Sequence, residues 1–192
     1  MELHKFGIKL FAEGAANLDL LELIPLFHGW IQQRRLSDLA IDVADYTHVH
    51  HGPGVMLIAH EGNYALDEAE GRRGLAYYLK RPLTAGGPAA LERALQRALQ
   101  AARLLETAPP PSAAQLRFPL TELEVFANDR LAVAHAMDPA LAGPVRQLAG
   151  HLFGPDGYEL AAAAADRRER PALRLRPTSP AAVDDLLQRL AA

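Results

Sequence analysis

The sequence contains no cysteine, and this absence removes several kinds of chemistry at once. Without thiols the chain cannot form disulfide bonds, thiolate metal sites or cysteine nucleophiles. A composition free of cysteine is compatible with a reducing compartment. Any chemistry must therefore depend on carboxylates, histidines, hydroxyl groups and basic side chains.

Long hydrophobic runs are also missing. Charged residues, prolines or glycines interrupt every apolar stretch before it reaches the roughly 18 residues needed to cross a bilayer. Residues 1–7 lack the basic region and the long apolar run of a secretory signal. We expect a soluble, cytoplasmic protein that does not enter a membrane.

Charge of one sign does not dominate the chain, since 20 Lys and Arg residues stand against 23 Asp and Glu residues. The resulting net charge of −3 gives no broad positive field to attract phosphate backbones, so broad nucleic-acid binding is not expected. Hydrophobic residues make up 49% of the 192 residues, which is typical of a folded globular chain. We expect one substantial core or two small ones.

The first part of the chain combines period-two and helical patterns. Alternating apolar residues predict strands at residues 5–12, 39–49, 55–66 and 75–79. Helical spacing predicts one helix that follows Asn17 as its N-cap and ends near Arg34, and a second from Leu91 to Leu105. Pro25 lies inside the first helix and either kinks it or opens a second one.

The second part repeats the same kinds of element. The pattern predicts a hairpin from strands 120–127 and 130–134, and two further strands at 158–164 and 172–176. Asp138 and Ser179, each followed by a proline, are expected to cap two more helices. This order predicts an α+β fold, with antiparallel sheet or sheets and helices on one face. Two similar subdomains, 1–106 and 115–192, could be joined by a proline-rich spacer at 107–114.

Four histidines lie within thirteen positions, at His48, His50, His51 and His60. If Gly52 and Pro53 are the centre of a hairpin turn, cross-strand partners have numbers that sum to about 105. This register places Asp45 opposite His60, and it places His48 and His50 on the face that carries Glu61.

Three interpretations of these histidines are open. Imidazole is a common ligand of transition metals, so His48, His50 and Glu61 could hold a divalent transition metal, while Asp45 and His60 could act as an acid/base pair. Haem could bind through one imidazole or through Tyr46. The simplest interpretation is that all of them are turn and sheet residues.

A second feature is a pair of basic dipeptides, Arg72-Arg73 and Lys80-Arg81, on either side of two tyrosines. Such a cluster could form a local anion or nucleic-acid patch, although a solvated face is the simpler interpretation. The sequence has no phosphate loop, recognisable nucleophile motif or complete set of metal ligands. The leading hypothesis is an accessory protein, a homodimer, that binds a protein partner or a small ligand. The alternative is a metal-dependent, hydrolase-like enzyme that uses the histidine hairpin at 45–61.

Overall fold

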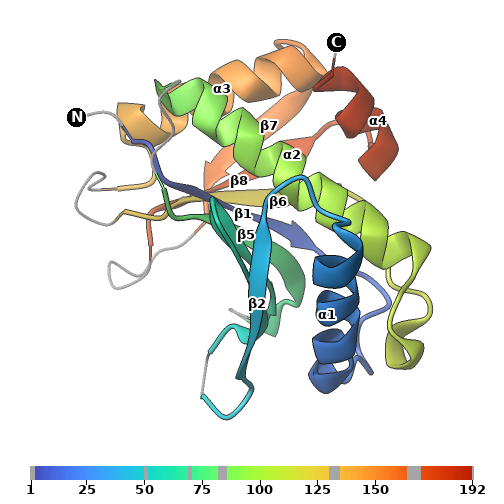
Figure 1. The fold of residues 1–192 in the computed structure, drawn as a ribbon. Helices are drawn as coiled ribbons and strands as arrows, with labels where there is room; N and C mark the ends of the chain where they lie inside the picture. Colours follow the sequence, from blue (N-terminus) through green and yellow to red (C-terminus); the bar gives the residue numbers. More distant parts are fainter. Residues whose placement is uncertain are drawn as a thin grey trace.

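The computed structural model describes residues 3–49, 52–68, 71–81, 86–129, 135–163 and 170–191. Within these ranges the protein has an α+β fold, in which one antiparallel sheet of eight strands carries four α-helices (Figure 1). The α+β prediction is confirmed.

The strands come from both ends of the sequence. They are β1 (Phe6–Phe11), β2 (Ala40–Tyr46), β3 (Gly54–Ala59), β4 (Gly62–Asp67), β5 (Gly74–Leu79), β6 (Leu123–Ala127), β7 (Tyr158–Ala162) and β8 (Ala172–Pro177). Their order in the sheet is β2-β3-β4-β5-β1-β6-β8-β7. The first strand therefore lies in the middle of the sheet, between β5 and β6, because its partners come from both halves of the sequence.

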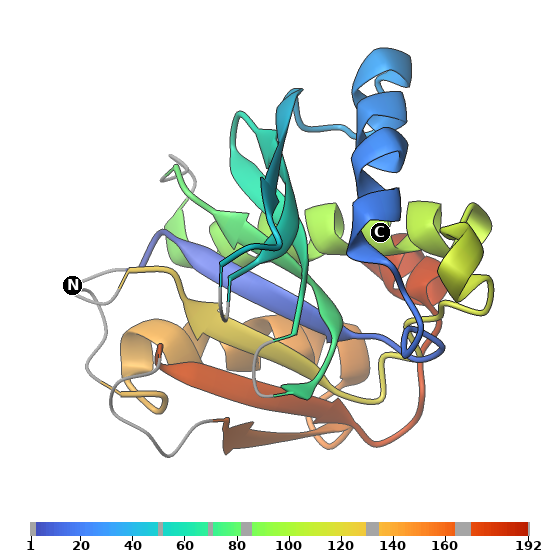
Figure 2. The same cartoon turned by 90° about the horizontal axis from the view of Figure 1, so that it is seen from below.

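The helices cover one face of the sheet. They are α1 (Leu23–Gln33), α2 (Gly86–Thr107), α3 (Pro139–Phe153) and α4 (Val183–Arg189), and the short 3₁₀ helices are η1 (Leu20–Glu22) and η3 (Pro111–Ala113). The long α2 packs on β1 and β5 and also contacts α3 and α4, whereas α1 packs beside β2 (Figure 1). Seen from below, the strands β1, β6 and β8 lie in front of α2 and α3, so no helix of the described ranges covers the other face of these strands (Figure 2).

One hydrophobic core lies between the sheet and the helices. Alternate residues of β1, Phe6, Ile8 and Leu10, point into it and are fully buried. The opposite face of β1 carries Gly7 and Lys9. A Cβ atom at Gly7 would lie only 2.0 Å from the ring of Phe126, so the aromatic ring covers the bare backbone there.

The predicted strand 55–66 is two strands. The chain reverses at His60 and Glu61, and Ile58 pairs with Asn63 across the resulting β3–β4 hairpin. This prediction was wrong because the mostly polar residues 60–63 between the two apolar runs mark a turn, and the two turn residues His60 and Glu61 are neither glycine nor proline.

The start of the first helix also differs from the prediction. Asp19, not Asn17, provides the cap, because its Oδ1 accepts the backbone N–H of Leu21 at 3.0 Å at the start of η1. Pro25 is the third residue of α1 and opens this helix instead of kinking its interior. The expected cap at Asp138 is confirmed, since its Oδ1 accepts the N–H of Ala140 at 2.9 Å.

The proline-rich segment 107–114 packs against the protein. Its residues 111–113 form η3, and Ser112 donates both its N–H and its hydroxyl to Glu22. Strand β6, which follows this segment, pairs with β1, so both predicted subdomains contribute to one sheet and one core. Whether the two parts fold separately stays a prediction. The predicted strand 130–134 lies outside the described residues.

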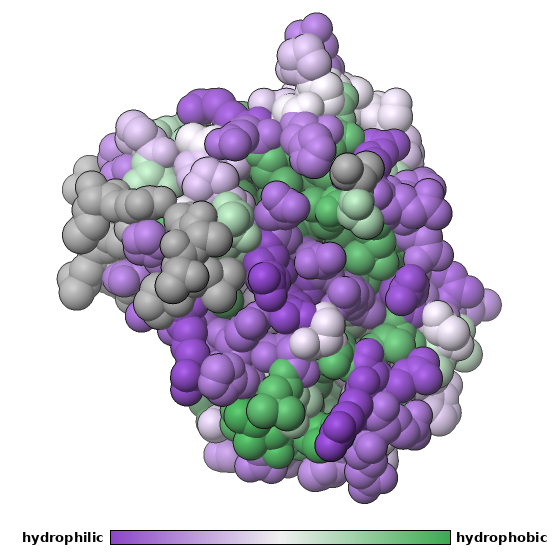
Figure 3. All heavy atoms as spheres, turned by 45° about the horizontal axis from the view of Figure 1, so that its top comes forward, coloured by the Kyte–Doolittle hydropathy of each residue, from purple (hydrophilic) through white to green (hydrophobic). Residues whose placement is uncertain are grey.

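The surface shows no large apolar area on the face seen in Figure 3, where hydrophilic side chains predominate and hydrophobic ones gather in separate patches. Among the described residues, the large hydrophobic side chains that are exposed are Leu21, Leu39, Ile41, Tyr46, Val49 and Met137. None of the helices in the described ranges is long and apolar enough to span a membrane. The homodimer stays a prediction.

Candidate functional site

The predicted catalytic residues Asp45 and His60 lie at opposite ends of the β2–β3 hairpin. Asp45 pairs with Val55, so from Asp42 to Tyr46 the partner numbers sum to 100 and not to the predicted 105. His60 follows the far end of β3, where its N–H donates to the carbonyl of Leu39 at 2.9 Å. Five strand residues from Val55 to His60 correspond to about 17 Å, so the predicted Asp45–His60 pair does not form.

The predicted metal ligands are also separated. His48 lies in the loop after β2, near Asp45, whereas Glu61 lies in the β3–β4 turn at the other end of the hairpin. His50 lies outside the described residues. Within the described ranges, no group of three His, Asp or Glu side chains is placed to hold a metal ion. Metal binding by the histidines stays a prediction.

Local contacts account for the environment of Asp45. Its Oδ1 accepts the side-chain hydroxyl of Thr47 at 2.6 Å and the backbone N–H of Thr47 at 2.8 Å. These hydrogen bonds lower the pKa of Asp45, and the neighbouring His48 acts in the same direction. Asp45 therefore stabilises the loop after β2 as a carboxylate.

Glu61 belongs to a polar cluster under α2. Its Oε2 accepts from Arg97 Nη2 at 3.0 Å, and the Arg97 side chain is only 7% exposed. Asp38, itself buried, accepts the backbone N–H groups of Glu61 and Gly62, each at 3.2 Å. These contacts join the β3–β4 turn to the α1–β2 loop and to α2, so Glu61 has a structural role in the fold.

Two buried tyrosines complete this cluster. The rings of Tyr64 and Tyr77 lie 4.7 Å apart, and their hydroxyls have no hydrogen-bond partner among the described residues. Burial raises the pKa of both phenols, and the nearby Asp38 and Glu61 act in the same direction. Both phenols are therefore neutral across the physiological pH range.

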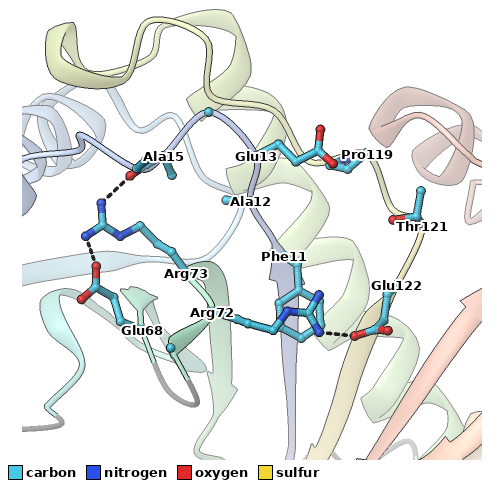
Figure 4. A pocket seen from close by; sticks show the side chains of 13 residues that line it. Phe11, Ala12, Glu13, Ala15, Glu68, Arg72, Arg73, Pro119, Thr121 and Glu122 are labelled. Atoms are coloured by element: carbon cyan, nitrogen blue, oxygen red, sulfur yellow. Dashed lines mark hydrogen bonds and ion pairs between the residues drawn. The ribbon is translucent and has the colours of Figure 1, made fainter.

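A cleft of about 560 Å³ opens at the end of β1 and at the starts of β5 and β6 (Figure 4). Three segments form its walls: residues 11–16 after β1, residues 68 and 71–73 at the β4–β5 turn, and residues 119, 121 and 122 before β6. These segments are far apart in the sequence and meet because β1 lies between β5 and β6. The volume lies within the usual range for small-molecule sites.

Arg72 forms the basic part of this cleft. Its guanidinium lies over the ring of Phe11, 3.6 Å from the ring centre, and its Nη1 donates to Glu122 Oε1 (Figure 4). The stacking and the ion pair fix the direction of the guanidinium, while 43% of the side chain stays exposed. Arg72 therefore presents spare N–H donors at a defined place in the cleft.

Arg73 has a different, structural role. Its Nη1 donates to the carbonyls of Ala15 and Leu18 at 2.5 and 3.1 Å, and its Nη2 forms an ion pair with Glu68. Burial lowers the pKa of Arg73. Because these contacts hold the loop after β1 against the β4–β5 turn, Arg73 shapes the wall of the cleft.

Glu122 is shared by several arginines. It accepts from Arg72 and, at 2.5 Å, from Arg176 Nε, and Arg174 Nε lies 3.8 Å from its Oε1. Burial acts to raise the pKa of Glu122, but hydrogen bonds and charges from Arg72 and Arg176 outweigh it and bring the pKa below the ordinary 4.5. Glu122 is therefore ionised at neutral pH.

The wall that carries Glu122 contains a backbone conformation rarely adopted by a residue with a side chain. Leu120, which is buried, has a φ of 49°, in the left-handed region. Such conformations cost about 1 kcal/mol or more and concentrate at functional sites. On the facing wall, Gly14 has a φ of 71°, and a Cβ atom there would lie 2.2 Å from the carbonyl oxygen of Gln115.

Sequence reasoning identified only part of this cleft. The sequence offers Arg72-Arg73 as part of a possible local anion or nucleic-acid patch, because adjacent basic residues beside aromatic residues are visible in it, but it favours a solvated face. Glu13, Phe11 and Glu122 carry no comparable signal. They line the same cleft as Arg72 only because β1 lies between β5 and β6 in the sheet.

Comparison of the chain with family models, with curated proteins and with solved structures finds no match.

Proposed function

We propose that the protein is a binding protein that holds a small anionic ligand in the cleft beside Arg72. The observation that carries this proposal is the charge balance around Glu122. Arg72 and Arg176 both donate to this one carboxylate, which leaves one net positive charge on two side chains that are 43% and 50% exposed. Of the two arginines, Arg72 lines the cleft, so a carboxylate or phosphate group there would use the remaining N–H donors of Arg72.

The other residues of the cleft support binding more than catalysis. Among the described lining residues, Thr121 provides the only side-chain hydroxyl, and no histidine or lysine accompanies it. A nucleophile requires a neighbouring base to activate it. Arg72, fixed on Phe11, is in contrast already oriented for a ligand, which lowers the entropy lost on binding.

The first test is a thermal-shift and calorimetric screen with inorganic phosphate, acetate and dicarboxylates, at low salt. We expect at least one of these anions to bind, and we expect Arg72→Gln to weaken that binding by about ten-fold or more, as for the loss of one charged hydrogen bond. The matched control is Arg35→Gln, since Arg35 is exposed after α1 and its side chain forms no hydrogen bond or ion pair within the described residues. Equal binding by the Arg72→Gln variant and the native protein would contradict the proposal.

A further inference from the structure

Glu13 is the one carboxylate of the cleft that the described residues leave without a hydrogen-bond or ion-pair partner. Its side chain is exposed and lies beside Pro119 on the wall of the cleft (Figure 4). The two other carboxylates of the lining are engaged, since Glu68 pairs with Arg73 and Glu122 pairs with Arg72. Glu13 is therefore available for a positively charged group.

The backbone of Glu13 is held in place although its side chain is free. Its N–H donates to the carbonyl of Arg117 at 2.9 Å, and its own carbonyl accepts the N–H of Arg117 at 3.0 Å. The adjacent Ala12 N–H donates to the carbonyl of Arg73 at 3.0 Å. Because this segment is tied to two walls of the cleft, the backbone from which the carboxylate of Glu13 extends is fixed on the same cleft that Arg72 lines.

Part of the cleft lining consists of small apolar residues. Ala12, Ala15, Ala16 and Pro119 belong to this part and provide no charge. A ligand that crosses this surface would bury a short aliphatic portion between one anionic end and one cationic end.

We infer that the ligand of the cleft is a zwitterion, an α-amino acid or a short peptide, whose carboxylate binds Arg72 and whose ammonium group binds Glu13. This inference rests on the proposed anion site at Arg72. It adds a second binding group, and it requires both charges on one molecule. Glu13 then determines specificity, because an anion without an ammonium group would leave its carboxylate unpaired.

The test compares three sets of probes by ligand-observed NMR and titration calorimetry. The first set is the free L-amino acids with alanine di- and tripeptides, the second is their N-acetyl derivatives, and the third is their C-terminal amides. For the best probe in the first set, we expect each of the two derivatives to bind about ten-fold more weakly or worse, because each loses one charged contact. Comparison of the amino acids with the peptides shows which length the cleft accepts.

The variant Glu13→Gln tests the role of the carboxylate, with Glu92→Gln on the exposed side of α2 as the matched control. We expect Glu13→Gln to bind the N-acetyl derivative as well as the free compound, whereas the control keeps the native preference. Equal binding of free and N-acetylated probes by the native protein would overturn the zwitterion and leave the anion site intact. Failure of every carboxylate and phosphate probe to bind would overturn the anion site as well. The comparison of derivatives on the native protein decides the inference even if a variant does not fold.

Discussion

Glu122 lies at the point where the cleft meets the uncovered face of the sheet. Its side chain is 11% exposed and is contacted by arginines from the β4–β5 turn and from β8. A carboxylate with several guanidinium partners is held ionised in the native state, whereas it titrates normally in the unfolded chain. The native stability should therefore depend on the protonation of this one residue.

We expect Glu122→Gln to lower the free energy of unfolding by about 1–2 kcal/mol at pH 7, because Arg72 and Arg176 lose a charged acceptor. Since the pKa of Glu122 is lowered on folding, its contribution is fully present above the ordinary value of 4.5 and is lost as pH falls through the folded pKa. The difference between native protein and variant should thus shrink at acidic pH. Urea unfolding of both proteins at pH 7 and at pH 3.5 measures this difference in the free energy of unfolding. The same difference at both pH values would contradict the stabilising role of the Glu122 carboxylate.

Glu61 gives a second prediction at the residue scale, because the sequence suggested it as a metal ligand and the structure places it beside Arg97. Replacement by alanine would leave a guanidinium that is 7% exposed without its carboxylate, so we expect a loss of about 1–3 kcal/mol in the free energy of unfolding. Glu92→Ala, an exposed carboxylate on α2, is the control. Elemental analysis of both proteins completes the test. A loss of bound metal confined to Glu61→Ala would support the metal hypothesis instead.

At the scale of elements, Asp38 connects the α1–β2 loop to the β3–β4 turn. Asp38 is 5% exposed, and its carboxylate accepts the backbone N–H of Glu61 in the turn and that of Gly62 at the start of β4. Asp38→Ala would leave both donors without an acceptor at the end of the hairpin. We expect a loss of about 1–3 kcal/mol in the free energy of unfolding.

Hydrogen exchange locates the effect of Asp38→Ala. The amides of Glu61 and Gly62 should exchange much faster in the variant, because they have lost their acceptor, whereas amides in α3 should keep their protection. Asp156→Ala, in the loop after α3, is the control for removing an exposed carboxylate. Unchanged protection at Glu61 and Gly62 would show that Asp38 does not hold this turn.

The sequence was sufficient to predict most elements and insufficient to predict their contacts. Alternation identified β1, and helical spacing identified α2 and α3, because these patterns follow directly from which face is buried. The turn at His60 was missed, and the register of the β2–β3 hairpin was wrong, because a loop of unknown length shifts every cross-strand partner. The cleft was only partly predictable, since Glu13 and Glu122 meet Arg72 through strand pairs between distant segments.

At the scale of the whole molecule, β1 joins the two parts of the chain. It pairs with β5 on one side and with β6 on the other, and the core extends across both pairs. The long helix α2 also packs on β1 and β5 while it contacts α3 and α4. Sheet and helix layers therefore both continue across the proline-rich segment 107–114.

This continuity leads to a prediction about the fragment 1–114. Without residues 115–192, one edge of β1 loses its β6 partner, and the apolar surface that α2 buries against α3 and α4 becomes exposed. An open edge of a central strand together with exposed apolar area favours aggregation over a stable fold. We expect the fragment to show no cooperative unfolding transition, and we expect addition of a fragment 115–192 to restore one. Circular dichroism and size-exclusion chromatography measure both outcomes. A fragment 1–114 that unfolds cooperatively by itself would establish the separate N-terminal subdomain that the sequence suggested, because only an independent core can produce such a transition.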